Sequence, residues 1–289
     1  VEEGATLHIE EGVKIIAVYD DIADYILVKQ GGKINAVGTP DKPIVMTSEK
    51  EEPGAWGGIH ICGRAHTNAE GGKGSSEIGG AVYGGNDDAD NSGTLQYIRL
   101  EYTGFAFDEE HEANGISFYG VGNGTIVDHC QAYKGSDDGF EFFGGSVNVS
   151  NLVAVSCSDD SFDWTEGWNG KGTNLVAYQE AESTLGYDCD CLMECDNNGS
   201  NNAATPVAHP VLKNLILVGN GGSKQGIRLR AGTEVEIDNA KICGKGQPLT
   251  VETALTENAL KNGTSKLTNI TLTSELSSKE GIYTHADFI

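Results

Sequence analysis

Two copies of one short pattern hold the residues in this sequence that are best suited to chemistry. Residues 135–168, GSDDGFEFFGGSVNVSNLVAVSCSDDSFDWTEGW, contain twice the order Asp-Asp, small residue, aromatic residue, acid, aromatic residue. The central acids Glu141 and Asp163 lie 22 residues apart, and so do Asp138 and Asp160. Carboxylates that are brought together either perform general acid–base chemistry or bind hard cations such as Ca²⁺.

The two copies belong to a wider set of four-residue motifs of the form small–apolar–polar–apolar. An apolar residue on each side of a polar one predicts a short strand whose polar side chain faces outward. The motifs are GIHI (58–61), GISF (115–118), GFEF (139–142), SFDW (161–164), LMEC (192–195, with a relaxed first position) and GIRL (226–229). If these strands stack, their polar residues form one column: His60, Ser117, Glu141, Asp163, Glu194 and Arg228.

Stacked strands are about 4.8 Å apart, so Glu141, Asp163 and Glu194 should stand at steps of roughly 5 Å. Carboxylates at that separation repel one another, and at least one pKa rises unless a cation lies between them. Arg228 offers one positive charge against three negative ones. We interpret Glu141, Asp163, Glu194 and Arg228 as a site, and as the catalytic residues if the protein is an enzyme. The alternative is a solvated face on a protein with 43 acidic residues.

The acids outside the column are candidates for a calcium site. Asp137, Asp138, Asp159 and Asp160 precede the strands, where Asp commonly accepts hydrogen bonds from turn amides. The two stacked pairs would also offer oxygen ligands to Ca²⁺. DADNSG (88–93) matches the start of a calcium loop through Asp88 and Asp90, but the twelfth position is Arg99, so it is not an EF-hand.

Several further residues have two interpretations each. Trp168 follows the second copy of the pattern, where it either stacks on a sugar ring or anchors a loop. Arg230 lies beside Arg228 and is a second candidate for substrate binding. We expect Trp164 in the core and His60 at the surface. Cys189, Cys191 and Cys195 are close enough in sequence to form a disulfide in an oxidising compartment.

A second repeated unit predicts how the strands are held in register. Asn precedes an apolar alternating segment in SNLVAV (150–155), TNLVAY (173–178), KNLILV (213–218), DNAKIC (238–243) and TNITLT (268–273). We expect Asn151, Asn174, Asn214, Asn239 and Asn269 to stack at one corner and to form a ladder of side-chain hydrogen bonds.

Short strands, turn-rich connections and repeats of 22–40 residues without a helical period predict an all-β solenoid. We expect a right-handed parallel β-helix of roughly eight to ten coils, forming a single domain over residues 1–289. Residues 62–93 and 183–211 are predicted to be loop insertions, the latter enclosing the strand at 192–195.

The net charge of −24 excludes two classes of partner. Such a field repels nucleic acid and anionic membranes, and no run of 18 apolar residues is present to span a bilayer. Because VEEGATLHIEEGVKI already has a strand-like pattern, we expect a mature or trimmed chain whose export signal is missing. We therefore expect a secreted or cell-surface monomer.

Three segments also carry a family resemblance. GAWGGIHICGRA (54–65), GGNDDADNSGTLQYIRLEYTG (84–104) and residues 135–172 resemble a widespread family of secreted and cell-surface bacterial right-handed parallel β-helix proteins of unsettled function. The resemblance covers the chain from about residue 26 onward. It implies a fold similar to that of pectate lyases and polygalacturonases, without implying their activity.

Two functions follow from these observations. The first is an extracellular calcium-binding β-helix that presents an extended face to a polysaccharide or cell-surface glycan. The second is a polysaccharide-degrading enzyme. A lyase would use Ca²⁺ with Arg228 or Arg230 as base, whereas a hydrolase would pair Glu141 or Glu194 with Asp163. We favour binding, because the Asn-Thr-Asp and Gly-His-Gly motifs of polygalacturonases are absent and the charge of −24 repels polyuronate.

Overall fold

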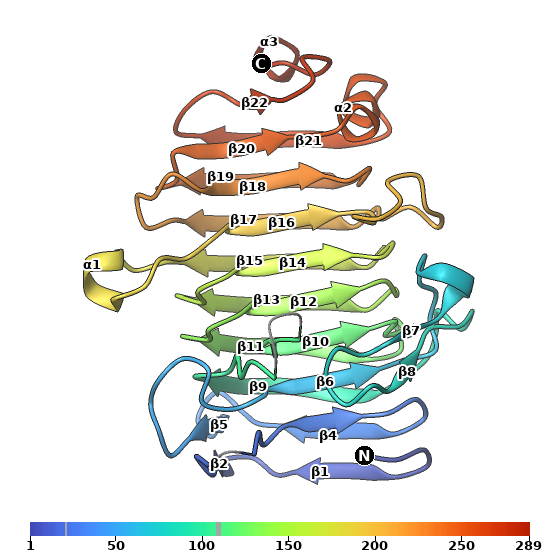
Figure 1. Cartoon of the computed structure of the whole chain (residues 1–289), viewed down its shortest axis with the longest axis vertical. Helices are drawn as coiled ribbons and strands as arrows, with labels where there is room; N and C mark the ends of the chain where they lie inside the picture. Colours follow the sequence, from blue (N-terminus) through green and yellow to red (C-terminus); the bar gives the residue numbers. More distant parts are fainter. Residues whose placement is uncertain (21, 108–110) are drawn as a thin grey trace.

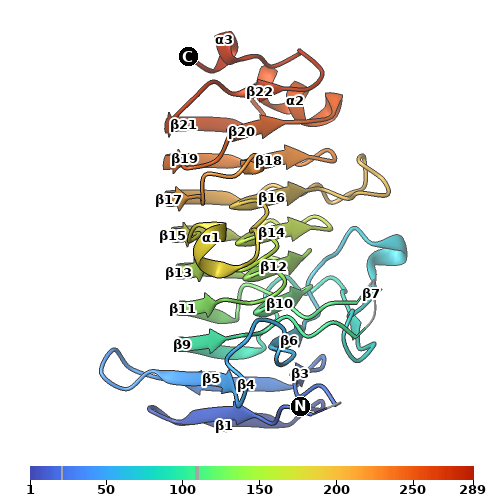
Figure 2. The same cartoon turned by 60° about the vertical axis from the view of Figure 1, so that its left-hand side comes forward.

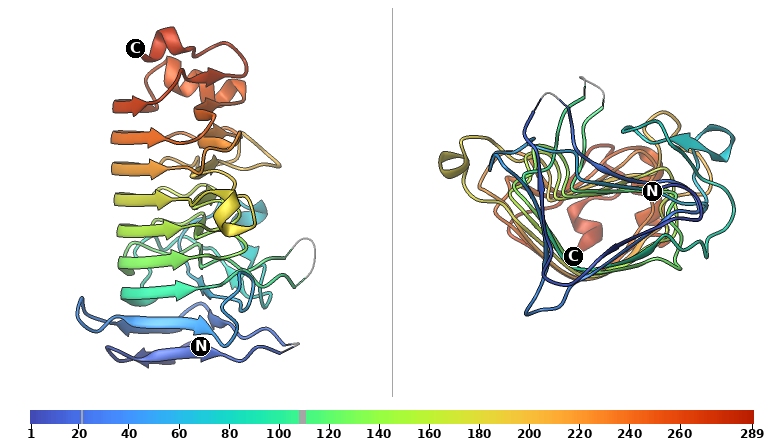
Figure 3. Two further views of the ribbon diagram at one scale, coloured as in Figure 1. Left: turned by 90° about the vertical axis from the view of Figure 1, so that its left-hand side faces the viewer. Right: turned by 90° about the horizontal axis from the view of Figure 1, so that it is seen from below.

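The computed structural model describes residues 1–20, 22–107 and 111–289, and it is a right-handed parallel β-helix with its termini at opposite ends (Figure 1). Each coil contributes to both of two parallel sheets, with one strand in each except in the first two coils, which place two strands in the first sheet. Viewed along the long axis, the coils superpose around one common interior (Figure 3). The predicted fold class is confirmed.

The sheet that we call the long-strand sheet has eleven strands. They are β1 (Thr6–Ile9), β2 (Lys14–Ala17), β4 (Lys33–Val37), β5 (Ile44–Ser48), β9 (Gly93–Glu101), β11 (Ile126–Tyr133), β13 (Asn148–Val155), β15 (Lys171–Tyr178), β17 (Val211–Val218), β19 (Glu236–Cys243) and β21 (Lys266–Leu272).

The sheet that we call the short-strand sheet has nine strands and carries the acidic column. They are β3 (Ile26–Val28), β6 (Ile59–Cys62), β10 (Ile116–Tyr119), β12 (Phe140–Phe143), β14 (Phe162–Thr165), β16 (Met193–Asp196), β18 (Gln225–Arg230), β20 (Gln247–Val251) and β22 (Ser277–Ser278). Its nine strands agree with the predicted number of coils.

The core lies between the two sheets and is built from stacked equivalents. Phe118 lies on Phe142 with ring centroids 4.9 Å apart, and Phe140 lies on Phe162 at 5.6 Å. Trp164 is buried as predicted. In-register pairing of parallel strands places equivalent side chains one above another, so each coil repeats the apolar contacts of the previous one.

A left-handed residue lies within each strand of the long-strand sheet from β9 onward. The first half of β9 pairs with β4 and its second half with β5, and Tyr97 between them has φ 52°. The residues that the strand alignment places level with Tyr97 share this conformation, with φ between 52° and 63°: His129, Asn151, Asn174, Asn214, Asn239 and Asn269. The asparagines therefore lie inside the strands, rather than before them as the sequence suggested. Asn tolerates this conformation better than most residues.

The asparagine side chains are hydrogen-bonded from coil to coil on the outside of the sheet. Asn174 Nδ2 donates to Asn151 Oδ1 at 2.9 Å, Asn214 to Asn174 at 3.0 Å and Asn239 to Asn214 at 2.8 Å. Asn269 departs from the pattern because its Nδ2 donates to Asp238 Oδ1. We call the four residues from Asn151 to Asn239 the amide ladder.

Insertions lie at both ends of the strands of the short-strand sheet, after β6 and before β16. Residues 62–93 contain η1 (Glu70–Gly72), β7 (Gly74–Ser75) and β8 (Val82–Tyr83), and Asn68 Nδ2 reaches Asn197 Oδ1 at 2.8 Å in the loop after β16. The loop before β16 carries α1 (Glu182–Leu185) and leaves the coils at a different side (Figure 2). Helices α2 (Ala254–Lys261) and α3 (His285–Phe288) lie near the C-terminal end.

The amide ladder gives a prediction about stability. Asn214→Ala removes two ladder hydrogen bonds and places Ala in a left-handed conformation, so it should destabilise the fold by about 2 kcal/mol. Asn214→Gly removes only the bonds and should cost about 1 kcal/mol. The neighbouring exposed Lys213→Ala is the control and should have almost no effect. Urea unfolding measures all three, and equal stability of the Asn214→Ala and Lys213→Ala variants would contradict the prediction.

Candidate functional site

Strand pairing confirms the predicted column on the short-strand sheet. Ser117 is level with Glu141, Glu141 with Asp163, Asp163 with Glu194, and Glu194 with Arg228. The side chains of Glu141 and Asp163 are partly exposed on the outer face of β12 and β14. The apolar residues on either side of each acid face the core, so the strands hold the acids in a line.

His60 is at the start of the column but is not a surface histidine, so this prediction was wrong. Its side chain is fully buried, and its Nε2 lies 2.6 Å from the carbonyl oxygen of Gly57. Burial lowers the pKa of His60 to about 4, so the ring is neutral at pH 7. Tyr119, which is itself fully buried, stacks on the His60 ring with centroids 6.2 Å apart.

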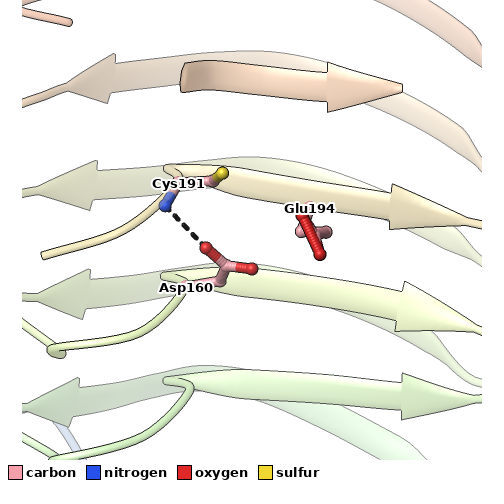
Figure 4. A group of neighbouring side chains, drawn as sticks. All are labelled: Asp160, Cys191 and Glu194. Carbon is pink, nitrogen blue, oxygen red and sulfur yellow. Dashed lines mark hydrogen bonds between the residues drawn. The ribbon is translucent and has the colours of Figure 1, made fainter. Parts of the chain in front are cut away.

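The second Asp of each pair stabilises the turn before its strand. The backbone N–H of Asp160 donates to Asp138 Oδ1 at 2.8 Å, and the N–H of Cys191 donates to Asp160 Oδ1 at 2.6 Å (Figure 4). Asn114 accepts the N–H of Asp138 in the same way. Each of these side-chain oxygens thus accepts a hydrogen bond from the backbone of the next coil. This is the structural role in turns that the sequence suggested as one interpretation of the Asp pairs.

The turn acids and the column acids meet in three groups whose possible ligand atoms lie within 4.8 Å of one another. Each group combines side chains from neighbouring coils. The groups are Asp138 with Glu141 and Asp163, Asp137 with Asp138 and Asp159, and Asp160 with Cys191 and Glu194 (Figure 4). We call the first group the carboxylate triad.

The carboxylate triad has little to balance its charge. Glu141 Oε2 accepts a hydrogen bond from Asn114 Nδ2, whereas Asp163 Oδ1 is buried and has no hydrogen-bond partner. Burial raises the pKa of Asp138, Glu141 and Asp163 well above the usual carboxylate range, and neighbouring negative charges raise it further. At neutral pH these acids either keep protons or require a cation.

The next position of the column is neutralised by arginine. Glu194 Oε2 lies 2.8 Å from Arg228 Nη1, and Glu194 Oε1 lies 2.8 Å from Arg230 Nη2. Arg228 also contacts Glu252 at 3.2 Å, and Arg230 contacts Asp196 at 2.7 Å. These acidic partners raise the pKa of both guanidinium groups despite their partial burial. The column therefore has an uncompensated acidic part beside a part with two arginines.

The chain matches the pectate-lyase-like β-helix domain over residues 1–288. The protein belongs to this family. No curated protein and no solved structure shows a match to the chain. Among the residues that the structure describes, none of the helices is long and apolar enough to cross a membrane.

One acid near the site of this pectate-lyase-like domain was missed by sequence reasoning. Glu77, in the 62–93 insertion, accepts a hydrogen bond from the hydroxyl of Tyr119 at 3.1 Å. Burial raises the pKa of Glu77 to about 7. The charge of Glu77 is the neighbouring charge that most raises the pKa of Glu141. No sequence signal identifies Glu77, because a residue in an insertion has no repeat position.

Trp168 does not line the outer face, so the predicted contact with sugar was wrong. Its side chain is 1% exposed and stacks on Phe142 with ring centroids 4.2 Å apart. Its Nε1 donates to the carbonyl oxygen of Val147 at 3.2 Å. Both faces of the indole therefore belong to the core, and the alternative role as a loop anchor is the one that the structure shows.

Asp88 and Asp90 lie apart from the three acidic groups and hold the insertion together. Asp90 Oδ2 accepts the backbone N–H of Arg64 at 2.8 Å, and Asp88 Oδ1 accepts that of His66 at 3.1 Å. Each bonded carboxylate oxygen thus already has a partner within the loop. The seven cysteines are free, including Cys189, Cys191 and Cys195, so the expected disulfide is not formed.

Asp137 and Asp159, which the sequence also suggested as metal ligands, lie beside the carboxylate triad. Asp137 and Asp159 belong to the group that shares Asp138 with the triad. Burial raises the pKa of Asp137 to about 7 and also raises the pKa of Asp159. A hard cation with six to eight oxygen ligands suits such a set, and Ca²⁺ is the predicted ion.

The raised pKa values predict how stability depends on pH without metal. A group whose pKa is higher in the folded state stabilises the fold below its unfolded value of about 4 and loses this effect as pH rises through the folded value. For Asp137 and Glu77 the folded pKa is about 7. In chelator, the melting temperature should therefore fall from pH 5 to pH 8. Glu141→Gln and Asp163→Asn should each flatten this profile, and a flat wild-type profile would contradict the prediction.

Proposed function

We propose that this pectate-lyase-like domain is an extracellular protein that binds Ca²⁺ at the carboxylate triad and recognises an acidic polysaccharide through the bound ion. The observation that carries the proposal is the buried, unpartnered Oδ1 of Asp163, within a group whose possible ligand atoms lie within 4.8 Å of one another. An isolated buried carboxylate oxygen is costly, and a cation removes that cost.

The triad supplies some of the oxygens that Ca²⁺ requires. Asp138 keeps one oxygen bonded to the N–H of Asp160, which leaves its second oxygen for the ion together with Glu141 and Asp163. Ca²⁺ takes six to eight oxygen ligands, so water or a ligand must supply the remainder. Glu141 and Asp163 are partly exposed, which supports access for a polysaccharide from solvent.

The charge distribution favours an acidic polymer that binds only in the presence of cations. A net charge of −24 repels polyuronate, whereas an ion at the triad is attractive to a sugar carboxylate. Arg228 and Arg230 follow the triad along the column, with side chains 28% and 32% exposed. Arg228 already donates Nε and Nη2 to Glu252 and Nη1 to Glu194, so its remaining N–H groups would be the donors to a second acidic sugar.

The geometry favours one enzymatic alternative over the other. Both arginines are ion-paired and have a raised pKa, so neither is suited to remove a proton as the base of a lyase. Glu141 and Asp163 are level on adjacent strands and have raised pKa values. A pair of carboxyl groups about 5 Å apart suits a retaining glycoside hydrolase. Hydrolysis is therefore the second candidate function.

Calcium should stabilise the folded protein. A ligand that binds only the folded state adds about 2.7 kcal/mol at a hundredfold excess over Kd. The melting temperature at pH 7.5 should rise with millimolar Ca²⁺ relative to chelator, and Glu141→Gln and Asp163→Asn should each reduce the rise. Glu182→Gln, which removes an exposed acid in α1, is the control and should keep it. Equal melting curves with and without Ca²⁺ would overturn the proposed ion.

Polyuronate should retard the protein only when calcium is present. In affinity electrophoresis through gels that contain polygalacturonate, we expect retardation with Ca²⁺ and none with chelator. Arg228→Gln should weaken binding about tenfold, the effect of losing one charged contact of about 1.4 kcal/mol. Free mobility in both gels would contradict acidic polysaccharide recognition. Release of reducing ends that Asp163→Asn abolishes would instead show the hydrolase.

A further inference from the structure

The outer face of the long-strand sheet carries two rows of apolar side chains beside the amide ladder. A shallow cavity of about 230 Å³ is lined by Asn174, Val176, Asn214, Leu215, Ile216, Asn239 and Lys241. Strand pairing places Val153, Val176 and Ile216 in one row and Val155, Tyr178 and Val218 in the next. We call the amide ladder and these two rows together the ladder strip.

The polar edge of the ladder strip has hydrogen-bond donors that the fold does not use. Each side-chain amide has two N–H groups, and the contact to the preceding asparagine uses one of them. Asn174, Asn214 and Asn239 are exposed, so the second N–H of each is available to a ligand. These donors recur once per coil, at steps of about 4.8 Å.

The apolar edge of the ladder strip is open to solvent. Ile216 is 51% exposed and Tyr178 is 48% exposed, and both lie on the outer face of adjacent strands. Val153 and Val176 are partly exposed beside them. A continuous apolar surface bordered by polar groups is typical of binding sites. The ring of Tyr178 also offers an aromatic face of the kind that packs well against apolar ligand surfaces.

We propose that the ladder strip binds a neutral polysaccharide chain that lies along the axis of the β-helix. A sugar ring has apolar C–H faces and a hydroxyl-bearing edge, which match the valine, isoleucine and tyrosine rows and the amide edge. A repeating polymer also matches donors that recur at a constant step. The amide ladder and both apolar rows are uncharged, with Lys241 following Ile216 at the end of one row, and the net charge of −24 disfavours an acidic polymer, so we take a neutral chain as the occupant.

This surface is separate from the carboxylate triad, which lies on the short-strand sheet. Binding at the ladder strip requires no cation, because none of its amide and apolar side chains is acidic. A protein that uses both faces would join a neutral glycan to an acidic one. The proposed calcium-dependent binding at the triad and the proposed binding at the ladder strip can therefore fail independently. Chelator separates them, because it should abolish only the first.

The test is affinity electrophoresis in chelator through gels that contain hydroxyethyl cellulose, galactomannan or xylan, with a polymer-free gel as reference. We expect at least one of these polymers to retard the wild-type protein. Ile216→Asp and Tyr178→Asp should each weaken retardation about tenfold or more, because each places a charge under the apolar face of the sugar. Ile126→Asp is the matched control, since Ile126 is also 51% exposed on the same sheet but lies outside the ladder strip.

Three outcomes would overturn this proposal. The first is free migration of the wild-type protein in every neutral polymer. The second is retardation of the Ile216→Asp variant as strong as that of the wild type. The third is a wild-type dimer on size-exclusion chromatography that Ile216→Asp converts to monomer, because the strip would then be covered by a second copy. Melting curves of the three variants confirm that each remains folded.

Discussion

In-register stacking of parallel strands is the constraint on which the rest of this structure depends. It brings each residue within about 4.8 Å of its equivalents in the coils above and below, whatever their chemistry. Contacts between identical groups stabilise the fold when the groups are phenyl rings, as for Phe118 and Phe142, or amides, as for Asn174 and Asn214. The same geometry is unfavourable for carboxylates, because like charges at this distance repel one another. The line from Glu141 to Glu194 therefore destabilises the stacking that holds the coils together.

The left-handed residues in the long-strand sheet show how an unfavourable backbone conformation is offset by a contact that recurs from coil to coil. A left-handed residue within a strand is unfavourable for most side chains, and Asn is among those that tolerate it best. Once one coil adopts this conformation, the next coil offers an amide at hydrogen-bonding distance, as Asn151 does for Asn174. At the N-terminal end the same position is held by Tyr97 and His129, whose stacked rings replace the amide contact.

The column could be predicted from sequence for two reasons. The alternation of apolar and polar residues decides which face of the strand a side chain occupies, and its position in the repeated motif decides which residues of other coils it stacks on. Glu141, Asp163 and Glu194 required no further information. The burial of side chains near the ends of the strands could not be predicted in this way. It depends on loop insertions, whose residues have no equivalent in the other coils. Glu77 enters the site from such an insertion. The two interpretations of Trp168 could not be separated from sequence, because the turn after β14 returns its ring to the core, a change of direction that strand alternation does not report.

The two parts of the column differ in the source of their neutralising charge, and this difference bears most directly on function. Beside Glu194 the chain supplies its own cations, Arg228 and Arg230, so that position is balanced without any ligand. One coil earlier, Asp163 lies beside Glu141 with an unpartnered oxygen, and the charge of Arg230 lowers the pKa of Asp163 by less than burial and the neighbouring acids raise it. A fold that needed only to be stable would gain from an amide or hydroxyl at these two positions, as it has at Ser117. An uncompensated pair of acids next to a compensated one is better explained by an ion that comes from outside the chain, with the arginines placed to contact whatever the ion attracts.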